Sequence, residues 1–159
     1  MKYIIGLGAN LGNREENIQQ AVDALSLVPD TAVLRQSSLY ETEPVGYDDQ
    51  PSFYNCCLEV SSSLEPGEML GVCLGIEAGL GRVREIKNGP RKIDMDVIFA
   101  EDKAVQSANL TVPHPRYHER RFVLIPLLEL FPDGEAYGIP FKQHLFGIRG
   151  QAVKEVNDN

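Results

Sequence analysis

Apolar positions along the chain repeat with two different periods, and the period predicts the kind of element. Alternation over two residues, or a short apolar run, is typical of strands, whereas spacings of three and four residues are typical of amphipathic helices. The strand pattern occurs in residues 2–8, 32–40, 53–61 and 93–100, with a shorter apolar piece at 110–114. The helix pattern occurs in residues 13–27, 66–81 and 120–130. The chain after residue 132 is weakly patterned.

The ends of the predicted helices carry residues that suit helix termini. Asn13 is a suitable N-cap for the first helix, with Glu15 and Glu16 in its first turn. Pro66 stands near the start of the second helix, where proline is tolerated. Pro126 is expected to break the third helix close to its start.

The order of these elements predicts a single α+β domain over residues 1–159. The second and third strands follow each other without a helix between them, which favours antiparallel neighbours. We therefore expect an antiparallel-rich sheet flanked by helices. The polar, turn-rich stretch 41–51 between those two strands is predicted to be a long loop, and loops of that length are often functional.

Composition and charge limit the possible partners. The 159 residues are 43% hydrophobic and 24% charged, as in an ordinary globular domain, with a formal net charge of -8. An acidic protein does not bind a polyanion by overall attraction, so nucleic acid is not an expected partner. No apolar run approaches the ~18 residues of a membrane span. The apolar stretch at the start of the chain is too short for a secretory signal. We expect a cytoplasmic protein without membrane contact.

The three cysteines are expected to be small core residues. Cys56 and Cys57 are adjacent in a predicted strand and would therefore point to opposite faces of the sheet. Cys73 lies in the second predicted helix. An odd number without a Cys-x-x-Cys motif argues against a disulfide framework and a structural zinc site.

Positive charge is concentrated in two stretches of this acidic chain. Residues 82–92 and 114–121 together hold eight of its 15 lysines and arginines. This concentration favours a small anionic ligand, although two solvated loops would give the same pattern. Arginine in particular can bind phosphate through two parallel hydrogen bonds.

Asp94 and Asp96 form the strongest local feature. They alternate with Met95 and Val97 in a predicted strand, so both carboxylates project from one face, about 6–7 Å apart. Such a pair needs solvent or a cation, and Mg²⁺ prefers a few carboxylates together with water and phosphate oxygens. The alternative is an edge strand with exposed aspartates. Carboxylates that hold a metal beside several arginines indicate phosphoryl transfer.

Other candidate residues have both a structural and a functional interpretation. Phe53 and Phe122 could be core residues, or they could stack on a flat ring whose edge Asn55 would recognise. His114 lies in the second basic stretch, which raises its functional interest. The glycine-rich segment 6–12 lacks the dinucleotide fingerprint, and the sequence contains no P-loop motif.

Several motifs, taken in order, resemble the 6-hydroxymethyl-7,8-dihydropterin pyrophosphokinase family. The resemblance spans roughly residues 3–130, and its most specific part is the stretch GPRKIDMDVI at residues 89–98. The other matching stretches are residues 6–12, 38–46, 50–55, 76–77, 81–84, 112–114 and 119–122.

The resemblance implies a ferredoxin-like fold and a reaction. An enzyme of this family moves the β,γ-pyrophosphoryl group of ATP to the hydroxymethyl oxygen of the pterin. The products are AMP and the pterin diphosphate, an intermediate of folate synthesis. ATP is then the co-substrate, two Mg²⁺ ions are expected about 3.5–4 Å apart, and the protein is expected to be a monomer.

The resemblance also implies residue roles. Asp94 and Asp96 would hold the metal ions, and Arg82 and Arg91 would stabilise the transferring group, so these four are the expected catalytic residues. The pterin would be bound by Thr42, Pro44, Val45, Phe53, Asn55 and Phe122. The nucleotide would be bound by Glu77, Arg84, Ile98, His114 and Arg120.

The sequence differs from the family at a few positions, and other functions stay open. Leu74 stands where many members have glutamine, Asn88 where tryptophan is common, and Asn109 where some members have arginine. These differences concern contacts with ATP and the closure of residues 82–92, which look like a mobile lid. A different metal-dependent phosphotransferase would move only the γ-phosphoryl group and form ADP. A non-catalytic binding domain would need no metal and would tolerate Asp94→Asn.

Overall fold

The computed structural model describes residues 1–43, 50–81, 92–148 and 151–156. The strands are Lys2–Ala9 (β1), Thr31–Gln36 (β2), Tyr40–Thr42 (β3), Phe53–Ser62 (β4), Asp94–Ala100 (β5), Val105–Gln106 (β6), Thr111–Val112 (β7), Glu135–Ala136 (β8), Ile139–Pro140 (β9) and Val153–Glu155 (β10). The α-helices are Arg14–Ser26 (α1), Pro66–Gly79 (α2) and Arg121–Leu130 (α3), and 3₁₀ turns form at Tyr117–Glu119 and Lys142–Gly147.

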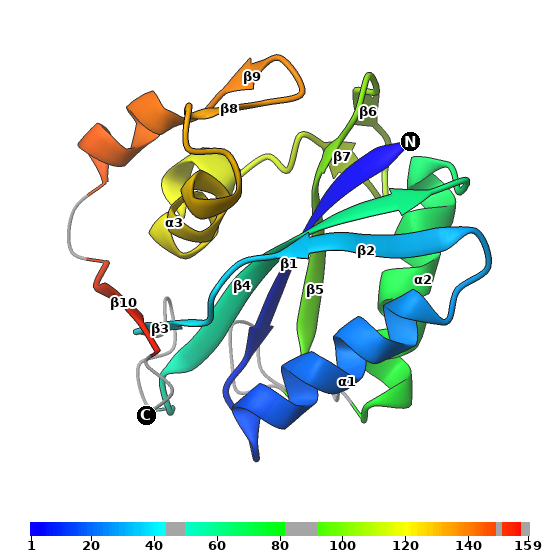
Figure 1. The fold of residues 1–159 in the computed structure, drawn as a ribbon, viewed down its shortest axis with the longest axis horizontal. Helices are drawn as coiled ribbons and strands as arrows, with labels where there is room; N and C mark the ends of the chain where they lie inside the picture. Colours follow the sequence, from blue (N-terminus) through cyan, green and yellow to red (C-terminus); the bar gives the residue numbers. More distant parts are fainter. Residues whose placement is uncertain (44–49, 82–91, 149–150, 157–159) are drawn as a thin grey trace.

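One antiparallel sheet organises the fold. Its strand order is β10-β3-β4-β1-β5, and β2 also pairs with β4 (Figure 1). The path from β1 through α1, β2, β3, β4 and α2 to β5 gives the ferredoxin-like arrangement, so the predicted α+β class is confirmed. The hairpins β6–β7 and β8–β9 lie outside this sheet.

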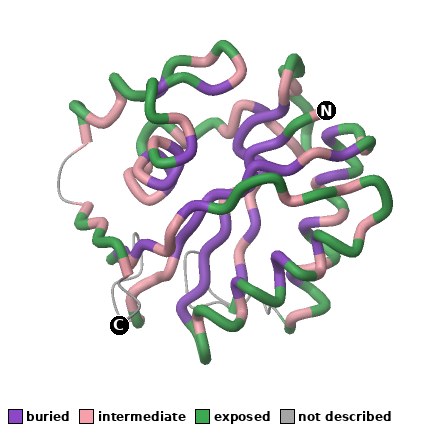
Figure 2. Tube along the Cα trace, in the orientation of Figure 1, coloured by how far each residue is buried: buried purple, intermediate pink, exposed green. Residues whose placement is uncertain are grey.

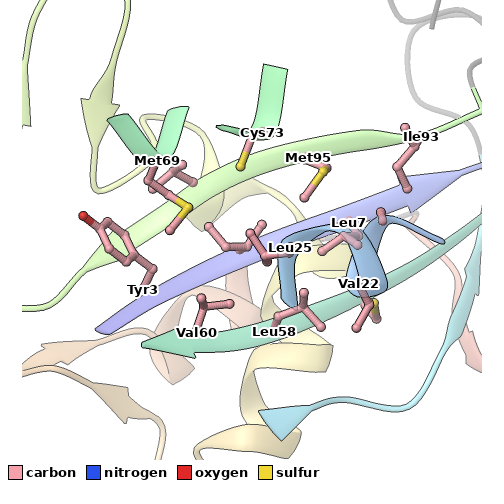
Figure 3. Packing of buried hydrophobic residues seen from close by; sticks show 14 of the residues in the cluster. Tyr3, Leu7, Val22, Leu25, Leu58, Val60, Met69, Cys73, Ile93 and Met95 are labelled. Carbon is pink, nitrogen blue, oxygen red and sulfur yellow. The ribbon is translucent and has the colours of Figure 1, made fainter. Parts of the chain in front are cut away.

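Helices α1 and α2 cover one face of the sheet, and their contact with it forms the larger core. Alternate residues of the central strands, among them Leu7, Leu58 and Met95, point to this side (Figure 3). They pack against Leu25 of α1 and Cys73 of α2, and all five side chains are buried. The period-two pattern of the strands therefore fills this layer with apolar side chains along its whole length.

Helix α3 covers the opposite face, over one end of the same strands (Figure 1). Ile4, Cys57 and Phe99 pack there with Leu124 and Leu127 of α3. Figure 2 shows the central strands as the most continuously buried part of the chain. The other end of this face carries polar residues, described below.

A register shift between β1 and β5 shapes this second core. Ile5 pairs with Val97 while Ile4 pairs with Phe99, so Ile98 is an extra residue in β5. Such a bulge lets two consecutive residues turn toward the same side. Ile98 and Phe99 accordingly both belong to the core beneath α3.

The helix termini agree with the sequence prediction. The Asn13 side chain accepts a hydrogen bond from the backbone N–H of Glu16 at 3.1 Å, as expected for an N-cap. Helix α2 begins at Pro66 and is capped by Glu65 and Glu68, whose side chains each bind the other's backbone N–H.

The predicted single strand over residues 32–40 is wrong, because the chain forms β2 and β3 with a break between them. At the break, the backbone N–H of Ser37 donates to the carbonyl of Cys57, and the Cys57 N–H donates to Ser37 Oγ, both at 2.9 Å. A side-chain oxygen thus replaces a backbone carbonyl in the ladder. β2 and β3 then pair with different parts of β4.

The expected break of the third helix at Pro126 is also wrong. Pro126 lies inside α3, which continues to Leu130. Proline only removes the hydrogen bond to the carbonyl of Phe122, one turn earlier. The buried side chains of Leu124 and Leu127 hold the helix against the sheet on both sides of this gap.

The prediction for the cysteines is confirmed. Cys56, Cys57 and Cys73 are free and buried, and Cys56 and Cys57 point to opposite faces of the sheet. Burial raises the pKa of the Cys56 and Cys73 thiols to about 12, so neither is a thiolate at neutral pH.

In the part of the chain that the structure describes, no helix has the length and apolar character needed to cross a membrane.

Candidate functional site

A cavity of about 310 Å³ opens on the α3 side of the sheet, at the end that α3 does not fill. It lies where β1, β3, β4 and β5 meet the turn that leads into α3. Its lining is formed by Gly8, Thr42, Glu43, Phe53, Asn55, Asp94, Asp96, His114, Arg116, Glu119, Arg120, Phe122 and Gln151.

The floor of the cavity exists because β1 carries glycines at alternate positions. Gly8 lies between Asn55 on β4 and Asp94 on β5, and Gly6 pairs with Asp96. A Cβ atom on Gly8 would lie 2.8 Å from Asn55 Nδ2, closer than real Cβ atoms come to another atom. The missing side chain therefore leaves room for the Asn55 amide and for the space above it.

The wall on the β3–β4 side presents a fixed amide. The Thr42 hydroxyl donates to Asn55 Oδ1 at 2.6 Å, and Asn55 Nδ2 donates to the carbonyl of Leu7 at 3.4 Å. These bonds determine which amide atom is oxygen and which is nitrogen. Phe53 from β4 and Phe122 from α3 line the same cavity, so two aromatic rings accompany this polar group.

The turn between β1 and α1 anchors the strand ends that carry Thr42 and Phe53. The buried Asn10 side chain donates to Gln50 Oε1 at 2.8 Å and to the carbonyl of Pro51 at 2.9 Å. Arg14 Nη1 in α1 donates to Glu41 Oε2 at 3.1 Å, and to the carbonyl and hydroxyl of Ser52 at 3.0 Å each. The first segment of the sequence therefore positions the polar and aromatic wall.

Asp94 and Asp96 lie on one face of β5, as the alternation predicts. Met95 and Val97 between and after them are buried against α1 and α2, so the two carboxylates face the cavity. From α2, Glu77 Oε2 accepts a hydrogen bond from the backbone N–H of Met95 at 2.8 Å. Glu77 thus holds the peptide between the two aspartates from the opposite side.

The aspartate pair could hold a divalent cation. Hard oxygen donors on an open face are the ligands that Mg²⁺ accepts, completed by water or phosphate oxygens. Among the residues described, no group of three or more His, Cys, Asp or Glu side chains is arranged to hold a metal ion.

Basic groups complete the opposite side of the cavity. Arg120 Nη1 lies 3.8 Å from Asp96 Oδ2, and the Arg120 guanidinium lies 5.5 Å from the centre of the Phe122 ring. Burial, and secondarily the charge of Arg120, lowers the pKa of His114 to about 4. His114 is therefore neutral at pH 7. Its Nδ1 accepts the N–H of Arg116 at 3.1 Å, which leaves the proton on Nε2.

A second hollow of about 290 Å³ adjoins the cavity, because Asp96 and His114 line both. Its other walls come from Leu70 of α2, from β5 and from residues 107–111. Ile98 is fully buried nearby, and its carbonyl accepts the backbone N–H of His114 at 2.8 Å. The two hollows therefore meet at Asp96 and His114.

The structure brings together most of the predicted site residues that it describes. Glu77 and Ile98 do not line the cavity. Glu77 accepts the N–H of Met95, which lies between the two lining aspartates, and the carbonyl of Ile98 accepts the N–H of His114, which lines the cavity. The residues that share the cavity are Thr42, Phe53, Asn55, Asp94, Asp96, His114, Arg120 and Phe122. The predictions for Pro44, Val45, Arg82, Arg84 and Arg91 lie outside the described residues.

Five lining residues were not among the predicted site residues. Gly8 had a signal in the sequence, since glycine at alternate positions of a predicted strand leaves one face bare. Arg116 belongs to the second basic stretch. Glu43 and Glu119 lie within the stretches 38–46 and 119–122 that carry the family resemblance, although no role was expected for either. Gln151 had no signal in the sequence, because only the tertiary fold brings it to the cavity.

The sequence of this chain is similar to that of known proteins. Residues 4–132 match the family described as 7,8-dihydro-6-hydroxymethylpterin-pyrophosphokinase (HPPK). A 2-amino-4-hydroxy-6-hydroxymethyldihydropteridine pyrophosphokinase from Bacillus subtilis is 45% identical over 145 residues, which is 91% of this chain and 87% of that protein. The folic acid synthesis protein fol1 of Pneumocystis carinii is 46% identical over 81% of this chain, which spans only 17% of that longer protein.

Solved structures support the fold. A crystal structure of an HPPK-DHPS in complex with substrates superposes with a TM-score of 0.67 at 13% identity, over 92% of this chain and 43% of that one. An HPPK-DHPS from Plasmodium falciparum gives a TM-score of 0.64 at 15% identity over the same shares of the two chains. Together with the sequence match over residues 4–132, this shows that the chain belongs to the 7,8-dihydro-6-hydroxymethylpterin-pyrophosphokinase family.

Proposed function

We propose that the protein transfers the pyrophosphoryl group of ATP to 6-hydroxymethyl-7,8-dihydropterin, forming AMP and the pterin diphosphate for folate synthesis. The observation that carries the proposal is that two aromatic rings and a fixed amide lie beside two carboxylates and a guanidinium in one cavity. The relatives named for this activity support the reaction. ATP is the co-substrate, and we expect the protein to act as a cytoplasmic monomer.

The pterin would occupy the β3–β4 side of the cavity. Its flat ring would stack between Phe53 and Phe122, and Asn55, with its amide fixed by Thr42, would recognise the ring edge. Pro44 and Val45 are proposed from the sequence resemblance to complete this side. The stacked ring would then place the hydroxymethyl group toward Asp94 and Asp96.

The nucleotide would occupy the second hollow and extend its phosphates past His114. Neutral His114 would donate from Nε2 to a phosphate oxygen, and Arg120 would neutralise phosphate charge. Glu77 and Ile98 would act on the nucleotide by holding Met95 and His114, respectively. Arg84 is proposed on the nucleotide side from the resemblance alone.

Asp94 and Asp96 would hold two Mg²⁺ ions, and their oxygens fit that metal. When bound, the ions supply charge neutralisation for the ATP phosphates. The reaction forms a bond between the hydroxymethyl oxygen and the β-phosphorus and breaks the bond between that phosphorus and the oxygen that leaves with AMP. The electron pair of the broken bond stays on the α-phosphate oxygen of AMP, and the hydroxyl proton passes to solvent water.

The chain's part in this reaction is positioning and charge stabilisation, since the substrate supplies the attacking oxygen. Arg82 and Arg91, proposed from the resemblance, would stabilise the charge on the transferring group together with Arg120. No covalent intermediate with the enzyme is needed.

The product nucleotide tests the proposal. We would incubate the protein with ATP, Mg²⁺ and 6-hydroxymethyl-7,8-dihydropterin, and separate the nucleotides by chromatography. The proposal predicts AMP that depends on both the pterin and the metal, and none after chelation. ADP would indicate transfer of the γ-phosphoryl group only, and an absence of both products would favour a binding domain.

A further inference from the structure

The segment of residues 151–156 lies beyond the stretch that matches the family, yet it borders the cavity. Strand β10 pairs antiparallel with β3, so that Val153 lies opposite Thr42. The backbone N–H of Val156 donates to the carbonyl of Leu39 at 2.8 Å. This segment is therefore an edge strand that supports the β3 wall of the site (Figure 1).

Gln151, two residues before β10, connects this edge strand to the opposite wall. Its Oε1 accepts the backbone N–H of Arg121 at 3.0 Å, and its Nε2 donates to the carbonyl of Glu119 at 3.0 Å. The two bonded residues flank Arg120, so one amide holds the peptide on both sides of it. Gln151 also lines the cavity itself.

The start of α3 explains why such a contact is useful. The N-cap position of α3 is Arg120, which makes no side-chain capping hydrogen bond. An N-cap is usually Ser, Thr, Asp or Asn, whose oxygen accepts one of the first free N–H groups of the helix. Arginine cannot accept a hydrogen bond, but its guanidinium lies close to Asp96 and over Phe122.

We propose that Gln151 is a positioning residue of the pterin site, which caps α3 from the C-terminal segment while the N-cap residue Arg120 serves the cavity. Through Gln151 and β10, residues 151–156 fix the wall that carries Arg120 and Phe122 relative to the wall that carries Thr42. This inference rests on the proposed function for its ligand, although the capping itself does not.

The test uses Gln151→Ala and, as a matched control, Gln143→Ala in the full chain. Gln143 is another glutamine of the C-terminal region; it donates to the carbonyl of Pro140 at an exposed position, does not line the cavity and makes no bond to Glu119 or Arg121. Amide hydrogen exchange by NMR reports the capping bond. We expect Gln151→Ala to speed exchange of the Arg121 N–H about 10-fold or more, and Gln143→Ala to leave it unchanged.

A conservative variant separates capping from general stability. Gln151→Glu keeps an oxygen that accepts the Arg121 N–H, and a carboxylate suits a helix N-terminus. We therefore expect exchange at Arg121 to return close to the wild-type rate. Unchanged exchange in Gln151→Ala, or no recovery in Gln151→Glu, would overturn the capping role.

Kinetics then test the link to the pterin. We expect the KM for the pterin to rise about 10-fold in Gln151→Ala, because the wall that carries Phe122 loses its support. We expect kcat to fall as well, because Arg120 lies between the two residues that Gln151 holds. Gln143→Ala should leave both kinetic constants unchanged. Faster exchange with an unchanged pterin KM would overturn the positioning role. A wild-type protein that forms no AMP would instead contradict the proposed function, and the exchange at Arg121 would still decide whether Gln151 caps α3.

Discussion

The two faces of one sheet differ in what they enclose, although the same strands β1, β4 and β5 supply both. On the α1–α2 side, alternate residues such as Leu7, Leu58 and Met95 form a closed apolar layer. On the α3 side, Ile4, Cys57 and Phe99 pack beneath α3, whereas Gly8, Asn55, Asp94 and Asp96 leave the cavity open at the other end. This difference shows how the fold makes room for a site. Over about half the length of the strands, the residues on the α3 face do not form a packed core, and a cavity remains.

The closed face also stabilises the open one. Glu77 reaches from α2 to the backbone of Met95, and so holds the strand on which Asp94 and Asp96 lie. Side chains on the open half can then be polar and partly solvated without loss of strand position. Changes on the two faces should therefore have different consequences, and the predictions below use this difference.

The largest effect is expected from the aspartates of the open face. Asp94→Asn or Asp96→Asn should lower turnover about 10³-fold or more, because each removes a negative charge from the proposed metal site. The melting temperature should change little, since neither carboxylate is a core group. Steady-state AMP formation and thermal unfolding measure the two effects.

Asp23→Asn is the control for this pair, since Asp23 lies on the exposed side of α1. It should leave turnover unchanged. Near-normal turnover in either variant of Asp94 or Asp96 would refute the metal role of that residue.

The next largest effect concerns the aromatic wall. Phe122→Ala should weaken pterin binding about 10- to 100-fold, since stacking on one aromatic ring contributes about 1–3 kcal/mol. Phe122 also packs at the edge of the α3 core, so Phe122→Leu, which keeps an apolar side chain there, separates stacking from packing. Titration of pterin fluorescence measures the affinity.

Phe146→Ala provides the comparison, because the Phe146 side chain is 83% exposed and lies outside the cavity. Its affinity for the pterin should equal that of the wild type. If the Phe122 variants also kept wild-type affinity, Phe122 would not belong to the stacking pair.

Two glycines sharpen the contrast between the faces. Gly8→Ala should raise the KM for the pterin about 10-fold and destabilise the fold by about 1–3 kcal/mol, because the new Cβ collides with the Asn55 amide. Gly71→Ala in α2 meets no atom within 4 Å and should stabilise the protein by about 0.5–1 kcal/mol without a kinetic effect. Urea unfolding and steady-state kinetics measure both. A harmless Gly8→Ala would show that the floor of the cavity does not need the missing side chain.

The smallest effect is a pH dependence of stability. The pKa of His114 is lowered from 6.5 to about 4, mainly by burial, so the folded protein resists its protonation. Above pH 6.5 the group is neutral in both states. Between pH 6.5 and 4 the unfolded chain binds a proton that the folded chain does not, and stability is lost as the pH falls.

His114→Gln cannot titrate and should therefore show a smaller loss of stability than the wild type between pH 7 and 5. Urea midpoints at these two pH values compare the proteins. An equal loss in both would mean that other groups account for the acid sensitivity.

The sequence predicted those elements whose signals are local. Asn13 as N-cap, Pro66 at a helix start and the alternation around Met95 each depend on neighbouring residues, and the structure agrees at all three. Pro126 misled the prediction because packing of α3 on the sheet outweighs one missing hydrogen bond. Ser37 split a strand through a contact with Cys57, which lies 20 residues away in sequence.

The part of the candidate site whose residues lie in short sequence motifs could be predicted. The motif around Asp94 and Asp96 and the pair of aromatic residues were found in this way. Gln151 could not be found, since it reaches the cavity only through the pairing of β10 with β3. Contacts of that kind depend on the tertiary fold and leave no periodic signal.

The central claim, that the open half of the α3 face binds the pterin, is tested most directly by mapping the bound ring. We would record ¹⁵N NMR spectra of the protein with Mg²⁺ and a non-hydrolysable ATP analogue while adding 6-hydroxymethylpterin. The account predicts the largest shifts at the Asn55 side-chain amide and at the backbone of Gly8 and Phe122, with little change at Leu25 and Cys73 in the closed layer. Shifts that cluster elsewhere and spare Asn55 would contradict it.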